Sequence, residues 1–157
     1  MLFNKSASYS QTPRLLINEF MADNDNIIAD DYGEYDDWFE LYNDEDTAIY
    51  LAGYYLTDDL TDPMQWALPD VTIPAKGYLL IWADDDLEQS AFHANFKLSK
   101  DGEQIGLYNG TTYVDSITFA PQYTDISYGR QSDGTEIWIF FDTPNNPSTP
   151  GAKNVYS

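Results

Sequence analysis

Short apolar runs separated by dense turn signals dominate this 157-residue chain. We count about ten such runs, at spacings of roughly 8–12 residues, which is the pattern of an all-β sandwich or barrel. Within Trp38–Tyr42 the side chains alternate between two faces, and Gly77–Trp82 is the most hydrophobic run. Asn109-Gly110 joins two alternating runs and predicts a hairpin, because both residues tolerate a positive φ. We also expect a strand at Phe96–Leu98.

The domain boundaries follow from the same turn residues and from local composition. Residues 1–13 have the composition of a linker or a cloning remnant, and residues 14–142 carry the strand pattern. Residues 143–157 are rich in proline, which cannot donate to a sheet ladder, so we expect a strap over the domain or a linker there. Helix is scarce: only Asp84–Ala94 could form a helical turn or two.

Composition restricts the possible partners. The chain has no cysteine, which excludes disulfides, cysteine-bound zinc and thiol nucleophiles. Its net charge of −20, with only seven basic residues, makes nucleic acid and anionic membranes poor partners. No apolar run is long enough to span a bilayer, and the N-terminal residues lack a signal-peptide core. Oligomeric state cannot be predicted from these features.

The acidic segment Glu19–Asp46 contains twelve of the 27 acidic residues. No lysine or arginine occurs between Arg14 and Lys76. Close carboxylates repel one another by roughly 4 kcal/mol per pair at the effective dielectric of a protein surface. The fold must therefore solvate this segment, hydrogen-bond it or neutralise it with a cation. The candidate metal ligands are Asp23, Asp25, Asp30, Asp31, Glu34, Asp36 and Asp37.

Three interpretations of this loop stay open. Calcium prefers six to eight such oxygens in flexible geometry, although the spacing is not that of an EF-hand. A solvated polar loop without metal and an acidic surface for a partner are the alternatives. If the fold brings Asp84–Asp86 beside the loop, a shared cation site gains support. His93 is the only histidine, and we interpret it as a packing or turn residue.

Several sequence blocks, in their order and spacing, resemble the lamin-tail domain found in bacterial exported proteins. The resemblance covers nearly all of residues 14–154. The blocks include LLINEFMADN (15–24), DDWFELYN (36–43), IPAKGYLLIWADDD (73–86), HANFKLSKDGEQIGLYN (93–109), SYGRQSDG (127–134) and TPGAKN (149–154). It implies an immunoglobulin-like β-sandwich of about 8–10 short antiparallel strands. The acidic insertion at residues 23–37 departs from the nuclear forms of the family, so their binding surfaces are not transferred to it.

The resemblance also implies a function. Such domains are non-catalytic accessory modules of larger secreted or surface proteins, which places this chain outside the cell. We expect it to tether a protein or polysaccharide through exposed rings such as Tyr32 and Tyr35, with calcium in the acidic loop. A cation-dependent hydrolase or enzyme accessory domain is the first alternative, and a structural spacer is the second. We expect structural roles for Trp38, Trp66, Trp82 and Arg130.

Overall fold

The computed structural model describes residues 11–156, and these residues form only strands, turns and loops. No helix among them could cross a membrane. The predicted linker at residues 1–13 lies largely outside the described residues. The strands are β1 (Leu15–Met21), β2 (Trp38–Asn43), β3 (Ile49–Tyr50), β4 (Tyr55–Thr57), β5 (Trp66–Ala67), β6 (Thr72–Ile73), β7 (Tyr78–Ala83), β8 (His93–Ala94), β9 (Glu103–Tyr108), β10 (Tyr113–Phe119), β11 (Ser127–Arg130) and β12 (Trp138–Phe141).

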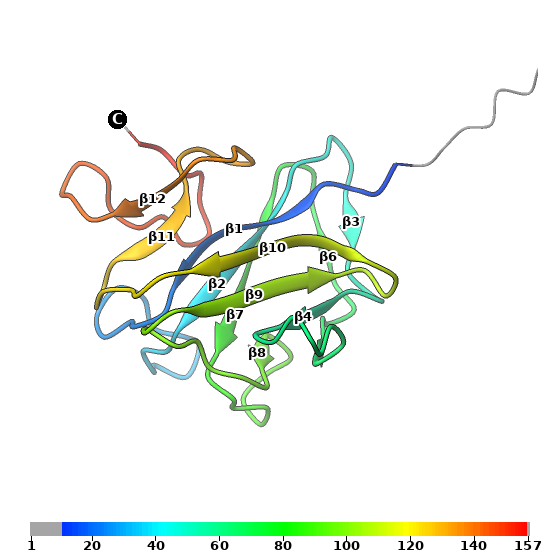
Figure 1. Ribbon diagram of the computed structural model, residues 1–157, viewed down its shortest axis with the longest axis horizontal. Coiled ribbons are helices and arrows are strands. Elements are labelled where there is room, and N and C mark those ends of the chain that lie inside the picture. The colour runs from blue at the N-terminus through cyan, green and yellow to red at the C-terminus, as the bar shows by residue number, and fades with distance from the viewer. Residues whose placement is uncertain (1–10, 157) are drawn as a thin grey trace, which may run out of the picture.

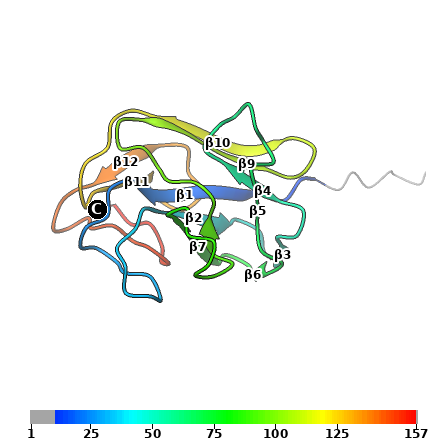
Figure 2. The ribbon, with the colours of Figure 1, turned by 90° about the horizontal axis from the view of Figure 1, so that it is seen from below.

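Two sheets form the sandwich (Figures 1 and 2). The larger has the order β12-β11-β1-β2-β7-β8, and the smaller has the order β10-β9-β4-β5. A two-stranded ribbon, β3-β6, lies at one end. The predicted Asn-Gly hairpin is confirmed: β9 and β10 pair antiparallel across it, and Gly110 has a φ of 90°.

One part of the predicted strand pattern is wrong. Phe96–Leu98 forms no strand, and the strand lies earlier, at His93–Ala94. This strand, β8, pairs with β7 in parallel, whereas the other strand pairs are antiparallel among the described residues. Residues 84–94, the one candidate for a helical turn, form the crossover that a parallel pair requires. The crossover places His93 beside Trp82 at the sheet edge.

The core lies between the two sheets. Phe39 and Leu41 of β2 face it, as the alternation predicted, and pack with residues such as Ile81 and Leu107. Trp66 is partly exposed on β5 and packs against the same core. Burying a large apolar side chain contributes about 1.5–3 kcal/mol each, so this layer supplies most of the driving force for folding.

The outer face of the large sheet is also covered at its two middle strands, because every residue of β1 and β2 is buried. At one end Trp38, Trp82 and Met21 form a second apolar cluster, against which Ile28 of the acidic loop packs. The Trp38 indole N–H is buried and donates no hydrogen bond. Ile28 therefore gives the acidic loop an apolar contact with the sheet, beside the hydrogen bond from the Ala83 N–H to the Asp37 carbonyl at 2.8 Å.

At the other end of this face, buried carboxylates accept hydrogen bonds from residues 149–154. Glu19 accepts from the N–H of Thr149 at 2.8 Å and from its hydroxyl at 2.6 Å. Glu40 accepts from the Gly151 N–H at 2.6 Å and from Asn18 at 3.0 Å. Glu19 and Glu40 are fully buried. These bonds attach the C-terminal segment to β1 and β2.

Arg130 connects the two sheets. Its guanidinium lies at the end of β11 and donates to the carboxylate of Asp115 on β10 at 2.9 Å. It also donates to the carbonyls of Ile17 at 2.8 Å and Thr135 at 2.7 Å. The side chain is 8% exposed and lies over the ring of Trp138, 5.1 Å from its centroid. The partners are thus one carboxylate, two carbonyls and one ring.

We predict that Arg130→Ala destabilises the domain by about 3 kcal/mol, because a nearly buried carboxylate loses its cationic partner and two carbonyls lose a donor. Arg14→Ala is the matched control: Arg14 is 57% exposed and pairs with Asp44 at the surface, which is worth less than about 1 kcal/mol. Urea unfolding measures both. Equal midpoints for the two variants would refute the structural role of Arg130.

We predict that stability falls as the pH rises from about 5 to 8. Burial raises the pKa of Glu40 to about 8, even though Asn18 and Gly151 lower it by hydrogen bonding. The folded state thus holds a proton that the unfolded chain has lost, and stability declines through this window. Glu40→Gln removes on the order of a few kcal/mol of that decline. Urea titrations from pH 5 to 9 test this, with exposed Glu136→Gln as the control; identical slopes in parent and Glu40→Gln would contradict it.

Candidate functional site

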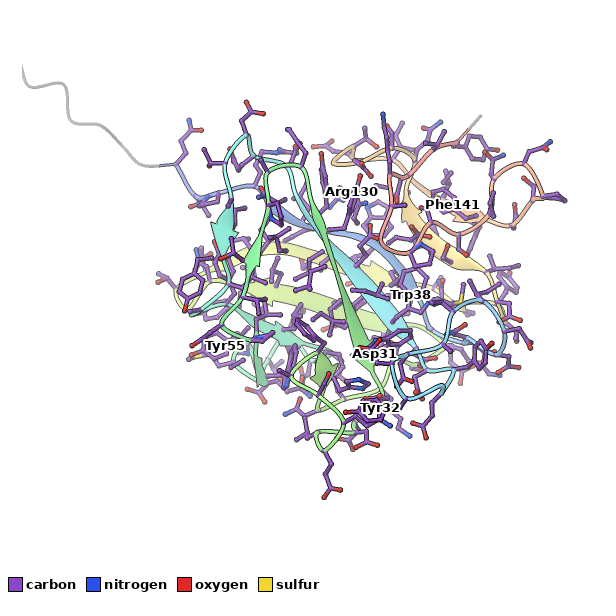
Figure 3. All side chains as sticks on the ribbon, turned by 180° about the vertical axis from the view of Figure 1, so that it is seen from behind. Asp31, Tyr32, Trp38, Tyr55, Arg130 and Phe141 are labelled. Atoms are coloured by element: carbon purple, nitrogen blue, oxygen red, sulfur yellow. The ribbon has the colours of Figure 1, made fainter. Side chains whose placement is uncertain are left out.

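The acidic loop occupies residues 22–37, between two strands that are paired at their ends. Met21 of β1 lies opposite Trp38 of β2, so the loop leaves and re-enters the sheet at one place. Figure 3 shows its residues Asp31 and Tyr32 near one end of β7, on the outer side of the large sheet. Ile28 of the same loop packs against the Trp38 cluster.

Asn24 holds the loop closed. Its side chain is almost fully buried, and its amide donates to the carbonyls of Ile28 at 2.7 Å and Asp36 at 2.8 Å. Its side-chain oxygen accepts from the N–H of Ile27 at 3.1 Å. An asparagine fits here because it offers two donors and an acceptor in one plane. The two limbs of the loop are therefore joined through a single side chain.

Asp30 organises the tip of the loop. One carboxylate oxygen, Oδ1, accepts from the N–H of Tyr32 at 2.8 Å and from that of Glu34 at 2.9 Å. The turn around it requires a positive φ at Gly33, 83°, which glycine adopts without steric cost. The other oxygen, Oδ2, is buried and accepts no hydrogen bond. The loop thus holds Asp30 rigidly and leaves one inward-facing oxygen free.

His93 meets this oxygen from the sheet. The ring is 2% exposed and stacks against Trp82, with the centroids 6.5 Å apart. Its Nδ1 is 2.5 Å from Oδ2 of Asp84, and its Nε2 is 4.0 Å from Oδ2 of Asp30. The three side chains present ligand-type atoms within 4.8 Å of one another. We expected His93 to be a packing or turn residue. Its ring does pack, but both ring nitrogens also face carboxylates.

A second group of three acids shares Asp30. Glu34, which is exposed, and Asp36, which is half-buried, bring carboxylate oxygens within 4.8 Å of each other and of Asp30. Oδ2 of Asp36 is also buried without a hydrogen-bond partner. Burial, together with the charges of Asp84, Asp30 and Glu34, raises the pKa of Asp36. Negative charge is therefore concentrated here beyond what local hydrogen bonds compensate.

A polar hollow of about 200 Å³ opens beside these groups. Asp36 and Asp84 line it, together with Asp23, Asp37 and the exposed Lys97. Burial and the nearby Asp23 raise the pKa of Asp37 to about 7. A small cation in this hollow would meet Asp36 and Asp84, one member of each group.

The structure brings together only part of the predicted ligand set. Asp30, Glu34 and Asp36 converge. Asp23 instead accepts from the Thr124 hydroxyl at 2.6 Å, and Asp37 lies across the hollow. The exposed Asp25 and Asp31 belong to neither group of converging atoms. Of the three aspartates at 84–86, Asp84 converges with Asp30 of the loop and completes the site.

The two tyrosines of the loop flank the site. Tyr32 is 56% exposed; its ring meets His93 edge-on, with centroids 6.0 Å apart, and its hydroxyl donates to the Gln89 carbonyl. Tyr35 is 49% exposed and lines the polar hollow. Rings at these positions can contact a partner beside the buried carboxylate of Asp30.

A family model for the Lamin Tail Domain matches residues 8–121. The chain belongs to this family. The match covers the acidic loop, the crossover and β8, so every member of the converging site lies within the lamin-tail domain. A search among curated proteins finds no significant match to the chain. The family and its immunoglobulin-like fold, inferred from the sequence blocks, are thereby confirmed.

Sequence analysis of this lamin-tail domain missed His93 as a member of the site. A lone histidine after Phe92 carries no spacing signal for a metal. Its role depends on the parallel placement of β8, which brings residue 93 beside residue 30. The signal that existed was indirect: a run of three aspartates, starting at Asp84, in the same crossover.

We predict that Asn24→Ala destabilises the lamin-tail domain by about 2 kcal/mol, because several buried backbone groups lose their partner. Asn26→Ala is the matched control, since Asn26 is exposed and its side chain makes only a surface bond to Asp125. Thermal unfolding compares the two, and limited proteolysis reports the opening of residues 22–37. If Asn24→Ala melts and resists protease like Asn26→Ala, the loop closes by other contacts.

Proposed function

We propose that this lamin-tail domain is a non-catalytic accessory module of a larger exported bacterial protein, and that it tethers a protein or polysaccharide. A divalent cation, with calcium as the ion expected from the loop's oxygen donors, would order the acidic loop. One observation carries the proposal. The loop presents Tyr32 and Tyr35 to solvent, above acids whose buried oxygens lack partners.

The chemistry of this face supports binding. Exposed aromatic rings supply large contact area at low entropic cost, and flanking carboxylates can accept hydrogen bonds from sugar hydroxyls or pair with basic side chains. With a net charge of −20, the domain would favour neutral or basic partners over anionic ones. The module would function outside the cell as part of its parent protein.

The experiment compares Tyr35→Ala with Tyr50→Ala, because Tyr50 is similarly exposed, 57% against 49%, but lies on β3, outside the loop. A glycan array and a pull-down with the intact domain are the assays. We expect Tyr35→Ala to reduce binding at least tenfold and Tyr50→Ala to leave it unchanged.

Three outcomes would contradict the proposal. Binding that is equal in both variants would place the interface elsewhere. Absence of binding to every probe would favour the structural spacer. Hydrolysis of phosphoester or glycoside substrates that disappears with Asp36→Asn would favour the cation-dependent hydrolase.

A further inference from the structure

His93 has two different neighbours on its two ring nitrogens. Nδ1 makes a short contact, 2.5 Å, with Oδ2 of Asp84, which fixes the orientation of the ring. Nε2 points toward Oδ2 of Asp30, at 4.0 Å. A hydrogen bond needs a separation near 3 Å, so a proton on Nε2 would not bridge the second gap. The ring is thus held by one carboxylate and directed at another that it does not reach.

We propose that this gap is a binding site for a zinc-type divalent ion, held by Nε2 of His93 and Oδ2 of Asp30. Glu34 and Asp36 converge on Asp30 in a second group, and Asp84 is a positioning residue for the ring. The inference rests on the proposed ordering of the loop by a cation, and it names the ion class and the ligands.

Burial is the first argument. Asp30 has a side-chain exposure of 0%, yet its Oδ2 accepts no hydrogen bond. Oδ2 of Asp36 is likewise buried and accepts no hydrogen bond. Buried polar atoms are almost always paired, and an unpaired carboxylate oxygen is costly. One cation beside Asp30 would satisfy its Oδ2, and it would reduce the repulsion from Asp36, which brings a carboxylate oxygen within 4.8 Å of one of Asp30. No basic side chain other than His93 forms an ion pair with Asp30 or Asp36 among the described residues.

The separation of the atoms is the second argument. Zinc lies about 2.0–2.1 Å from an imidazole nitrogen and about 2.0–2.2 Å from a carboxylate oxygen. A gap of 4.0 Å therefore accommodates one ion at a wide angle. Closure by about half an ångström gives tetrahedral geometry with these bond lengths.

The donor chemistry selects the ion. Imidazole suits zinc, copper, iron and nickel, whereas calcium is bound by oxygen donors alone. A metal-binding histidine almost always donates its other N–H to a carboxylate or carbonyl, and Asp84 occupies that position on His93. The sequence-based expectation of calcium rested on the loop acids alone, without the residue that β8 contributes.

The consequence for the fold is a crosslink. Asp30 belongs to the loop between β1 and β2, and His93 begins β8 at the edge of the same sheet. An ion between them would fasten the loop to the sheet beneath the exposed Tyr32, whose ring already covers His93. Asp84, which holds the ring, and Asp36 also line the polar hollow, which opens to solvent.

Isothermal titration of the untagged, chelator-treated chain with zinc and, separately, with calcium tests the proposal. We expect one equivalent of zinc to bind. Asp30→Asn and His93→Gln should lower the zinc affinity at least 100-fold, and Asp84→Asn should lower it 10–100-fold, as for other residues that orient metal-bound histidines. Asp46→Asn is the matched control, because its side chain is 98% exposed and the charge change is the same.

X-ray absorption of the zinc-loaded parent protein gives a readout that needs no substitution. The chain has a single histidine, so imidazole scattering around the zinc would identify His93 directly. Zinc bound without imidazole in its shell, or with undiminished affinity in His93→Gln, would overturn the inference.

The two proposals fail separately. Calcium binding that is lost in Asp30→Asn but unaffected by His93→Gln would retain the cation-ordered loop and refute the zinc site. Binding of neither ion would refute both. Zinc binding that Asp46→Asn weakens as strongly as Asp30→Asn would assign the ion to the acidic surface in general, and would also overturn the site.

Discussion

Burial of both faces of β1 and β2, in the middle of the large sheet, is the constraint on which the rest of this domain depends. The smaller sheet covers one face of β1 and β2. The other face must be covered by loops, because no second layer is present there among the described residues. Residues 22–37 cover the Trp38 end, and residues 149–154 cover the Glu40 end. Each of these two segments brings polar groups into contact with buried carboxylates. The buried acids of this domain therefore lie on the outer side of the large sheet.

The two covers satisfy their buried acids in different ways. At the Glu40 end, backbone and side-chain donors from the C-terminal segment pair with the carboxylates. At the Asp30 end, the loop saturates one oxygen and leaves the other facing His93. A structural network completes its hydrogen bonds within the chain. The incomplete network around Asp30 is what distinguishes a candidate binding site from a stabilising one.

Most of the sandwich could be predicted from local patterns. The alternation in Trp38–Tyr42 assigns each side chain to the correct face, and Asn109-Gly110 specifies its hairpin because the turn is local. The misplaced strand at Phe96–Leu98 has a tertiary cause: β8 forms where the crossover returns to β7, and two residues carry no periodicity. The candidate site is harder to predict from the sequence than the strands are. Residues 30, 84 and 93 converge through a loop, a crossover and an edge strand, and no sequence spacing encodes that meeting.

The position of Arg130 has a consequence for where this domain can be cut. The family match ends at residue 121, before β11 and β12. A fragment that stopped there would lose the guanidinium that serves Asp115 and Ile17, and it would lose the partner that covers the free edge of β1. An exposed edge of this length is a template for pairing with other chains. The folding unit is therefore longer than the segment that the family model matches, and a soluble fragment must include the strands beyond it.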